Sequence, residues 1–236
     1  MRVLIIIPTY NERENIAALI RNIWNELPSI DILVVDDNSP DGTGEVVEHL
    51  IQANNNQNLA LLNRPHKEGL GKAYLAGFQW AIQKQFDAMI EMDADFSHRP
   101  EDLKHMLACL NTFDFVIGSR YVLGGSVRNW SLWRRMISRG GSLYASLILG
   151  YPVKDWTGGF NLWKREVIQA LLKTNISSEG YSFQIELKYK ALKLGFRGIE
   201  FPILFDDRRV GQSKMSSRIV WEALLQVWRL RAWKPS

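Results

Sequence analysis

Two aspartates two positions apart are the residues whose type and spacing most directly suggest chemistry. Asp93 and Asp95 follow the apolar run 87–92, which is typical of a buried strand. In an extended backbone, residues i and i+2 point to the same side, so both carboxylates could reach one hard divalent cation such as Mg²⁺ or Mn²⁺. Aspartates are also common in turns, so the pair alone does not separate a metal site from a polar loop. Glu91 is interpreted as a strand residue rather than a ligand.

Apolar and amphipathic segments alternate along the first half of the chain. Strand-like segments occupy residues 2–7, 31–37, 58–64, 87–92 and 114–119. Segments with helical periodicity lie between them, at residues 11–27, 43–53, 69–84 and 100–110. This alternation predicts an α/β fold in which a mostly parallel, Rossmann-like central sheet is flanked by helices. No Gly-x-Gly-x-x-Gly follows the first strand, so a dinucleotide-binding site is not supported.

Charged and polar residues follow several of the predicted strands. Ligands of open α/β sheets bind outside the carboxyl ends of the strands. If the strands are parallel, one edge of the sheet carries residues 8–12, 36–37, 93–95 and 119–120. This placement favours a metal site over an ordinary turn for Asp93 and Asp95. The pair Asp36–Asp37 fits a turn and a hydrogen-bond acceptor for a base or ribose equally well.

The second half of the chain has a different pattern, but nothing marks it as a separate domain. We expect a helix at 131–148, a short strand meeting a helix near 158–166, a helix at 181–195, a strand at 197–205 and a final helix from about 216. The sequence contains no internal repeat, low-complexity tract or convincing linker. One α/β domain is therefore the prediction.

Composition excludes several classes of protein. The 236 residues are 46% hydrophobic and 23% charged, and the net charge of +4 is too small for the basic patch of a nucleic-acid binder. Cys109 is the one cysteine, so an internal disulfide is excluded. The apolar N-terminal run ends at Pro8 with no small-residue cleavage site after it, which argues against a signal peptide. No segment approaches the roughly 20 apolar residues of a spanning helix.

Several segments occur together in the order and spacing of a known family. They are IIIPTYNERENI (5–16), VVDDNSPDGT (34–43), EMDADFSHRPEDL (91–103), GSRYVLGG (118–125) and DDRRVGQSK (206–214). Together they resemble the dolichol-phosphate (polyprenol-phosphate) mannosyltransferases, which are inverting glycosyltransferases of family 2 with the GT-A fold. The resemblance implies a GDP-mannose donor, a polyprenyl or dolichyl phosphate acceptor, and a Mg²⁺ or Mn²⁺ ion.

The resemblance assigns many of these polar residues to the donor and the metal. The residues that it implies around the donor nucleotide sugar are Pro8, Tyr10, Glu12, Val35, Asp37, Asp93, Ala94, Asp95, Arg120, Arg208 and Lys214. It implies that Asp93 and Asp95 bind the metal, and Ser97 stands where some members supply a glutamine ligand. Serine is a poorer ligand, so water could complete the metal shell. Arg208 and Lys214 belong to a loop that would close over the donor diphosphate, although their pattern alone is that of a solvated basic loop.

The implied acceptor is also an anion, so the site needs cations to bring it against the donor diphosphate. The resemblance implies that Arg120, Arg134 and Ser138 surround the acceptor phosphate and that, with Asp95, they form the catalytic set. Arg134 and Ser138 are four positions apart and would share one face of a helix. Arginine suits this role because its planar fork binds phosphate oxygens in pairs.

The roles of other residues near these motifs stay open. A phosphate monoester is already ionised at neutral pH and needs little help from a general base, so Glu186 and Asp155 are only candidates for that role. Trp156 either stacks on a sugar or packs in the core, and the core is favoured. Arg135 and Arg139 are interpreted as residues of a solvated helix face.

The final helix raises the question of membrane contact. A narrow polar stripe of Arg218, Glu222, Gln226 and Arg229 crosses an otherwise apolar and aromatic surface. Such a helix either docks on the domain or lies at a membrane interface. We expect a cytoplasmic protein that binds peripherally at the cytoplasmic face of a membrane, on its own or through a membrane-anchoring partner protein.

The prediction is therefore an inverting, metal-dependent mannosyltransferase that makes a polyprenyl β-mannosyl phosphate and GDP. Its expected parts are a GT-A domain at 1–215, with a nucleotide-sugar half at 1–120 and an acceptor half at 121–215, and an amphipathic helix at 216–236. One alternative is a polyprenol-phosphate glucosyl- or N-acetylglucosaminyl-transferase that uses a UDP-sugar. Another is a nucleotide-sugar-binding subunit without turnover.

Overall fold

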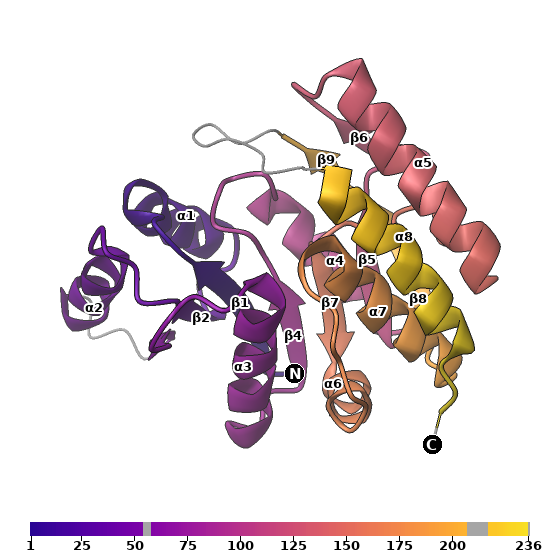
Figure 1. Cartoon of the computed structure of the whole chain (residues 1–236). Coiled ribbons are helices and arrows are strands. Elements are labelled where there is room, and N and C mark those ends of the chain that lie inside the picture. Colours follow the sequence, from indigo (N-terminus) through magenta and orange to yellow (C-terminus); the bar gives the residue numbers. More distant parts are fainter. Residues whose placement is uncertain (54–57, 207–216, 236) are drawn as a thin grey trace.

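The computed structural model describes residues 1–53, 58–206 and 217–235 (Figure 1). Within these residues a seven-stranded sheet has the order β3-β2-β1-β4-β7-β5-β8. Its strands are β1 (Val3–Thr9), β2 (Asp31–Asp36), β3 (Leu59–Asn63), β4 (Ala88–Glu91), β5 (Phe115–Ser119), β7 (Asn161–Lys164) and β8 (Gly198–Pro202). Strand β7 runs antiparallel to β4 and β5, and the other pairs are parallel. The predicted mostly parallel sheet is confirmed.

Helices cover both faces of the sheet. One face packs against α1 (Arg13–Glu26), α2 (Thr43–Ala53) and α4 (Leu103–Cys109), which follows the short 3-10 helix η1 (Pro100–Asp102). The other face packs against α3 (Leu70–Gln83), α6 (Arg165–Leu172) and α7 (Gly180–Lys193), with α5 (Leu132–Leu149) and α8 (Ser217–Ala232) beyond them (Figure 1). The two faces exist because successive strand residues point in opposite directions: Ile5 joins the first core, and Leu4 and Ile6 join the second.

Two features of the second half differ from the simple prediction. The reversed strand β7 is inserted between β4 and β5, which strand-helix alternation could not indicate. The strand expected at 197–205 is divided into β8 and β9 (Leu204–Phe205), and β9 pairs with β6 (Ser126–Val127) in a separate two-stranded sheet. Between β8 and β9, the backbone N–H of Ile203 donates to the carbonyl of Ser119 at 3.0 Å.

The carboxyl ends of four strands meet at one edge of the sheet. In the parallel register of β1 and β2, Thr9 is opposite Asp36, and in that of β1 and β4, Ile6 is opposite Glu91. Strand β5 has the same direction as β4, because both are antiparallel to β7. The segments expected to share an edge therefore do so, and the loops after β1, β2, β4 and β5 lie at this edge.

The final helix has one docked and one exposed side. Val227 and Leu230 of α8 are buried in the core formed with α5 and α7, whereas Leu225 and Trp228 are exposed. The side chains of Arg218 and Glu222 lie outside the described part of the structure. Among the described residues, no helix has the length and apolar character needed to cross a bilayer.

Gly77 allows α3 to lie close to the sheet. A Cβ atom at this position would stand 2.6 Å from Cγ2 of Ile6 and 3.4 Å from Cγ2 of Val35. We expect Gly77→Ala to lower the free energy of unfolding by about 1–3 kcal/mol, because the core would be overpacked. Denaturant unfolding monitored by circular dichroism measures the change.

The matched control is Gly140→Ala on α5, where a Cβ atom would meet nothing within 4 Å. This substitution should be neutral or stabilising by up to about 1 kcal/mol, because alanine is the better helix former. Equal effects of the two substitutions would contradict close packing at Gly77.

Candidate active site

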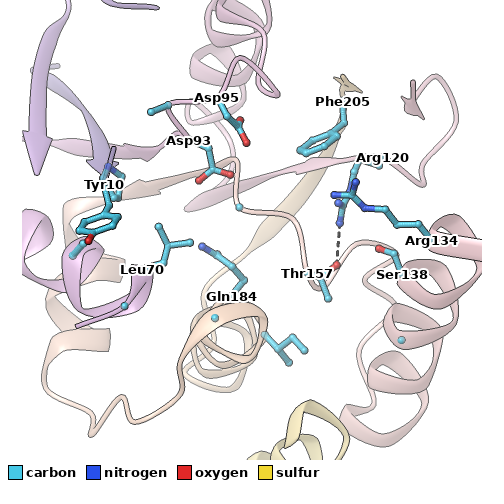
Figure 2. Close-up of a pocket in the computed structure, with 18 of the residues that line it drawn as sticks. Tyr10, Leu70, Asp93, Asp95, Arg120, Arg134, Ser138, Thr157, Gln184 and Phe205 are labelled. Carbon is cyan, nitrogen blue, oxygen red and sulfur yellow. Dashed lines mark hydrogen bonds between the residues drawn. The ribbon is translucent and has the colours of Figure 1, made fainter. Parts of the chain in front are cut away.

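A cavity of about 440 Å³ lies at the carboxyl edge of the sheet (Figure 2). Most residues that the sequence indicated contribute to its wall: Pro8, Tyr10, Glu12, Asp37, Asp93, Ala94, Asp95, Arg120, Arg134 and Ser138. Val35 and Ser97 are fully buried and do not line the cavity. Arg208 and Lys214 lie outside the described residues.

The two aspartates after β4 project from one loop into the cavity (Figure 2). The hydroxyl of Tyr74 donates to Oδ1 of Asp93 at 3.4 Å, and the backbone N–H of Ser97 donates to Oδ1 of Asp95 at 3.1 Å. Phe96, directly after Asp95, has a φ of 62°, a left-handed conformation that non-glycine residues adopt at a cost of about 1–3 kcal/mol. The loop is therefore held in a specific, strained shape.

His98 supports this loop, and the sequence analysis did not single it out. Its ring is buried and stacks on Phe160 at a centroid distance of 4.7 Å. The backbone N–H of Asp93 donates to Nδ1 of His98 at 3.1 Å, which requires that nitrogen to be unprotonated. Burial lowers the pKa of His98, although Asp93 and Asp95 act in the opposite direction. The signal available in the sequence was a histidine within the same acidic motif.

The donor set of the acidic loop fits Mg²⁺ or Mn²⁺. Two carboxylates reach the cavity from Asp93 and Asp95, and such ions take their other ligands from water and substrate phosphates. The hydroxyl of Ser97 is buried with no hydrogen-bond partner in the described part of the chain. In the same part, no group of three or more His, Cys, Asp or Glu side chains could form a metal cage. A shared ion therefore fits better than one enclosed by protein.

The neighbouring residues Asp36 and Asp37 have different roles. Asp36 accepts hydrogen bonds from the hydroxyls of Thr9 at 2.7 Å and Ser39 at 2.6 Å, which orders the turn. Asp37 lines the cavity and forms a buried ion pair with Arg64 at 2.6 Å. Burial raises the pKa of Asp37, and the guanidinium of Arg64 offsets only part of that effect.

A cationic cluster lies at the opposite side of the cavity. Arg120 donates through Nε and Nη2 to the two carboxylate oxygens of Asp155, both at 2.7 Å, and through Nη2 to the hydroxyl of Thr157 at 2.9 Å. The guanidinium carbon of Arg134 stands 4.1 Å from the ring centroid of Trp130. Figure 2 shows Ser138 beside Arg120 and Arg134, as expected from the helical spacing.

Lys188 holds the loop that carries Asp155 and Thr157, a role that the sequence analysis did not indicate. Its fully buried ammonium donates to the carbonyls of Asp155 at 3.2 Å, Trp156 at 3.1 Å and Gly158 at 2.7 Å. Burial lowers the pKa of Lys188, against the effect of nearby carboxylates. Trp156 is fully buried, so the core interpretation of that residue is confirmed.

Neither candidate base reaches the cavity. Glu186 is buried, pairs with Lys190 at 2.6 Å and accepts the backbone N–H of Ser178 at 2.9 Å. Asp155 is bound to Arg120, and neither carboxylate lines the cavity wall. Burial on its own would raise the pKa of Asp155, but the charge and hydrogen bonds of Arg120 outweigh it and keep that pKa below its usual value.

Comparison with known proteins identifies the family. The sequence profile of glycosyl transferase family 2 matches residues 4–172, which is more than half of the chain. The chain belongs to glycosyltransferase family 2. It is therefore an enzyme, and its acid-lined and arginine-lined cavity is the candidate active site of a glycosyltransferase.

Curated relatives of this glycosyltransferase align along nearly its whole length. An undecaprenyl-phosphate mannosyltransferase from Micrococcus luteus is 44% identical over 97% of this chain and 93% of the relative. A polyprenol monophosphomannose synthase from Mycolicibacterium smegmatis is 43% identical over 98% of this chain and 88% of the relative. A dolichol-phosphate mannosyltransferase from Pyrococcus furiosus is 34% identical over 99% of this chain and 65% of the relative. These relatives confirm the family indicated by the sequence motifs.

Solved structures of similar fold are more distant in sequence. A mannosyltransferase from Pyrobaculum calidifontis, in complex with GDP-mannose and Mn²⁺, superposes with a TM-score of 0.70 at 21% identity, covering 100% of this chain and 66% of that chain. Glucosyl-3-phosphoglycerate synthase from Mycobacterium tuberculosis gives a TM-score of 0.67 at 16% identity, covering 100% of this chain and 81% of that chain. At these identities the likeness establishes the GT-A fold alone.

The buried pair of Arg120 and Asp155 generates a stability prediction. We expect Asp155→Ala to lower the free energy of unfolding by about 3–5 kcal/mol, because it leaves a buried guanidinium without its carboxylate. Chemical denaturation at neutral pH measures this change. Asp31→Ala is the control, because Asp31 pairs with the exposed Arg2 and its loss should cost at most about 1 kcal/mol. Similar losses in both variants would show that the buried pair has no special role.

Proposed function

We propose that the enzyme transfers mannose from GDP-mannose to a polyprenyl or dolichyl phosphate with inversion, assisted by Mg²⁺ or Mn²⁺. The observation that carries this proposal is that one cavity contains the two carboxylates of Asp93 and Asp95 and the cationic cluster of Arg120 and Arg134. A nucleotide diphosphate-sugar and a lipid phosphate are both anions, and this arrangement offers each a separate electrostatic partner. The names of the curated relatives support the same sugar and acceptor class.

The reaction would need few groups beyond those that hold the substrates. A divalent ion bound at Asp93 and Asp95 would supply positive charge against the leaving diphosphate. Arg120 and Arg134 would hold the acceptor phosphate, and Ser138 would add a hydroxyl contact. One phosphate oxygen would form the new bond to the anomeric carbon as the bond to GDP breaks on the opposite side. The acceptor brings its own negative charge, so the absence of Glu186 and Asp155 from the cavity wall is consistent with a reaction that needs no general base.

The donor nucleotide would occupy the other end of the cavity. Pro8, Tyr10, Glu12 and Asp37 line that end, and Nζ of Lys67 stands 3.7 Å from the ring centroid of Tyr10. Lys67 is a cation that the sequence analysis did not single out. We assign the nucleotide to this side because it is the end nearest to β1 and β2, whose loops meet at the sheet edge.

A peripheral position at the cytoplasmic face of a membrane belongs to the same proposal. One side of α5 contributes Ile137, Ser138, Gly141 and Tyr144 to the cavity. The apolar residues that the same helix exposes are Leu132, Trp133, Met136, Leu143 and Leu147, with exposed fractions of 77, 69, 65, 62 and 76%. Exposed arginines accompany them on α5 and on the neighbouring α8: Arg135, Arg139, Arg229 and Arg231. An apolar helix face with basic neighbours suits an anionic membrane surface.

A donor and metal panel tests the reaction. GDP-mannose, UDP-glucose and UDP-N-acetylglucosamine, each radiolabelled in the sugar, are incubated with a short polyprenyl phosphate and either Mg²⁺ or Mn²⁺. We expect labelled lipid from GDP-mannose alone, and none after chelation of the metal. Asp95→Asn should lower turnover at least about 100-fold, because it removes charge that holds the leaving diphosphate through the metal. Asp31→Asn is the matched surface control.

The donor assignment and the metal assignment can each be contradicted by its own result. Efficient transfer from a UDP-sugar would overturn the proposed donor while leaving the reaction class intact. Wild-type turnover by Asp95→Asn would overturn the metal assignment even if GDP-mannose is the donor.

Liposome sedimentation tests the membrane position. We expect the double variant Trp133→Ser, Leu147→Ser to bind anionic liposomes at least about tenfold more weakly, because two large apolar side chains are lost from the exposed face. GDP-mannose binding checks that the variant is folded, since neither residue lines the cavity. Sedimentation equal to that of the wild type would contradict direct binding through α5 and favour an anchoring partner protein.

A further inference from the structure

Gln184 lines the same cavity as the acidic loop and the cationic cluster. It belongs to α7, and Figure 2 shows its amide below Asp93, with the cluster of Arg120, Arg134 and Ser138 to the right in the same view. Its Oε1 accepts a hydrogen bond from Nδ2 of Asn161 at 2.8 Å, and its Nε2 donates to Oε1 of Glu91 at 3.0 Å. Nε2 carries a second hydrogen, for which no acceptor is found among the described residues. A cavity-lining side chain thus keeps a donor for a ligand.

Glu91 fixes the orientation of this amide. Its carboxylate is fully buried and accepts N–H groups from Asn161 at 2.8 Å, Trp163 at 3.0 Å and Gln184 at 3.0 Å. Burial raises the pKa of Glu91, while these three donors act against that effect. Turning the amide of Gln184 would bring its oxygen against a carboxylate oxygen, so Nε2 must face Glu91. A buried carboxylate is costly for a fold, and here it determines which amide atom reaches the cavity.

Asn161 strengthens the same constraint. Its Nδ2 faces three acceptors, which are Oε2 of Glu91 at 2.8 Å, the carbonyl of Gly158 at 3.2 Å and Oε1 of Gln184 at 2.8 Å. Rotating the Asn161 amide by half a turn would place oxygen against all three. Glu91 therefore orients Gln184 both directly and through Asn161.

A small open space adjoins the amide of Gln184. A Cβ atom built on Gly159 would stand 3.8 Å from Oδ2 of Asp93 and 3.8 Å from Nε2 of Gln184. Glycine therefore leaves room between a carboxylate of the proposed metal site and the oriented amide. We call the space bounded by Asp93, Gly159 and Gln184 the central gap.

We propose that the central gap holds the hexose of the donor and that Gln184 determines sugar specificity by donating from Nε2 to a hydroxyl oxygen of that hexose. Glu91 and Asn161 are positioning residues for this contact. The inference rests on the proposed function. The transferred hexose is bonded to the diphosphate near Asp93 and is attacked by a phosphate held near Arg120 and Arg134. Its ring must therefore lie between these groups, and the central gap occupies that interval.

A directed donor in a small, largely buried site discriminates between hydroxyl patterns. A bound hexose that lacks the matching hydroxyl leaves the Nε2–H group without an acceptor, which is unfavourable away from water. A sugar that presents the hydroxyl accepts the hydrogen bond from Nε2 of Gln184. The amide does not have to reorient for this, because Glu91 already holds it in place. Gln184 should therefore affect affinity for the nucleotide sugar and have little effect on affinity for the nucleotide.

Isothermal titration calorimetry with GDP and with GDP-mannose, in the presence of Mn²⁺, measures the affinity for the nucleotide and for the nucleotide sugar separately. Gln184→Met has a similar length and lacks the donor. We expect it to weaken GDP-mannose binding about 10-fold and to leave GDP binding within about 2-fold. GDP binding also reports that the variant is folded. Gln169→Met on α6 is the matched control, because Gln169 is exposed and does not line the cavity.

Deoxy analogues of GDP-mannose identify the hydroxyl. The wild-type enzyme should bind one monodeoxy analogue about 10-fold more weakly than GDP-mannose, and Gln184→Met should bind the two equally. Glu91→Gln should reduce that discrimination, because its amide keeps only one acceptor oxygen. With that oxygen facing the two donors Asn161 and Trp163, an NH2 group would face Nε2 of Gln184. Full discrimination in Gln184→Met, or an equal loss of GDP and GDP-mannose binding, would overturn the assignment.

Gly159→Ala tests the central gap without disturbing the amide network. Its added methyl group meets only ordinary contacts of 3.8 Å in the free protein, so the variant should fold. It should weaken GDP-mannose binding and not GDP binding; unchanged GDP-mannose affinity would show that the hexose lies elsewhere. If the wild-type enzyme prefers another nucleotide sugar, the proposed donor is wrong. The comparison of nucleotide-sugar binding with nucleotide binding is then repeated with the preferred nucleotide sugar and its nucleoside diphosphate. Its outcome decides the role of Gln184.

Discussion

The arrangement of the cationic side of the cavity depends on the buried ion pair between Arg120 and Asp155. The backbone N–H and the side chain of Arg120 all donate to this carboxylate, and the N–H of Gly158 donates to it at 3.0 Å. Buried charges are tolerated only when such contacts replace water. The arginine is consequently held in place without a ligand, as the proposed role in binding a phosphate would require. Glu200 of β8 extends this support by accepting the N–H of Asp155 at 2.9 Å and the hydroxyl of Ser119 at 2.7 Å.

The residues that line the cavity differ in charge from one part of the wall to another. Carboxylates of the loop after β4 occupy one part, the arginine after β5 and an arginine of α5 occupy another, and the neutral amide of Gln184 lines the same cavity. The proposed reaction between two anions would require that each be bound by groups of suitable charge, with a region where the uncharged sugar fits. The separation is possible because the charged groups come from different elements that meet only in the folded sheet.

The general architecture could be read from the sequence because it depends on local patterns. Alternation of apolar runs with amphipathic segments predicted the sheet, and parallel strands brought the residues after β1, β2, β4 and β5 to one edge. Asp93 and Arg120 could be selected in this way, whereas Arg134 was indicated by the family resemblance. The supporting contacts could not, because they join residues far apart in the chain: Glu91 to Gln184, and Asp155 to Lys188. Lys188 looks like a solvated residue of an amphipathic helix, yet α7 is buried on nearly every side from Phe183 to Ala191.

The reversed strand β7 has a consequence for how the chain folds during synthesis. Strands β1 to β4 are complete once about ninety residues are available, but the free edge of β4 is paired only by residues 161–164. Until the ribosome has released that later segment, β4 presents unpaired backbone groups, which are a template for association with other chains. Strand β5 also waits for β7 before it can join the sheet. The nascent chain therefore carries an open sheet edge through much of its synthesis, and this interval is when a chaperone would matter most.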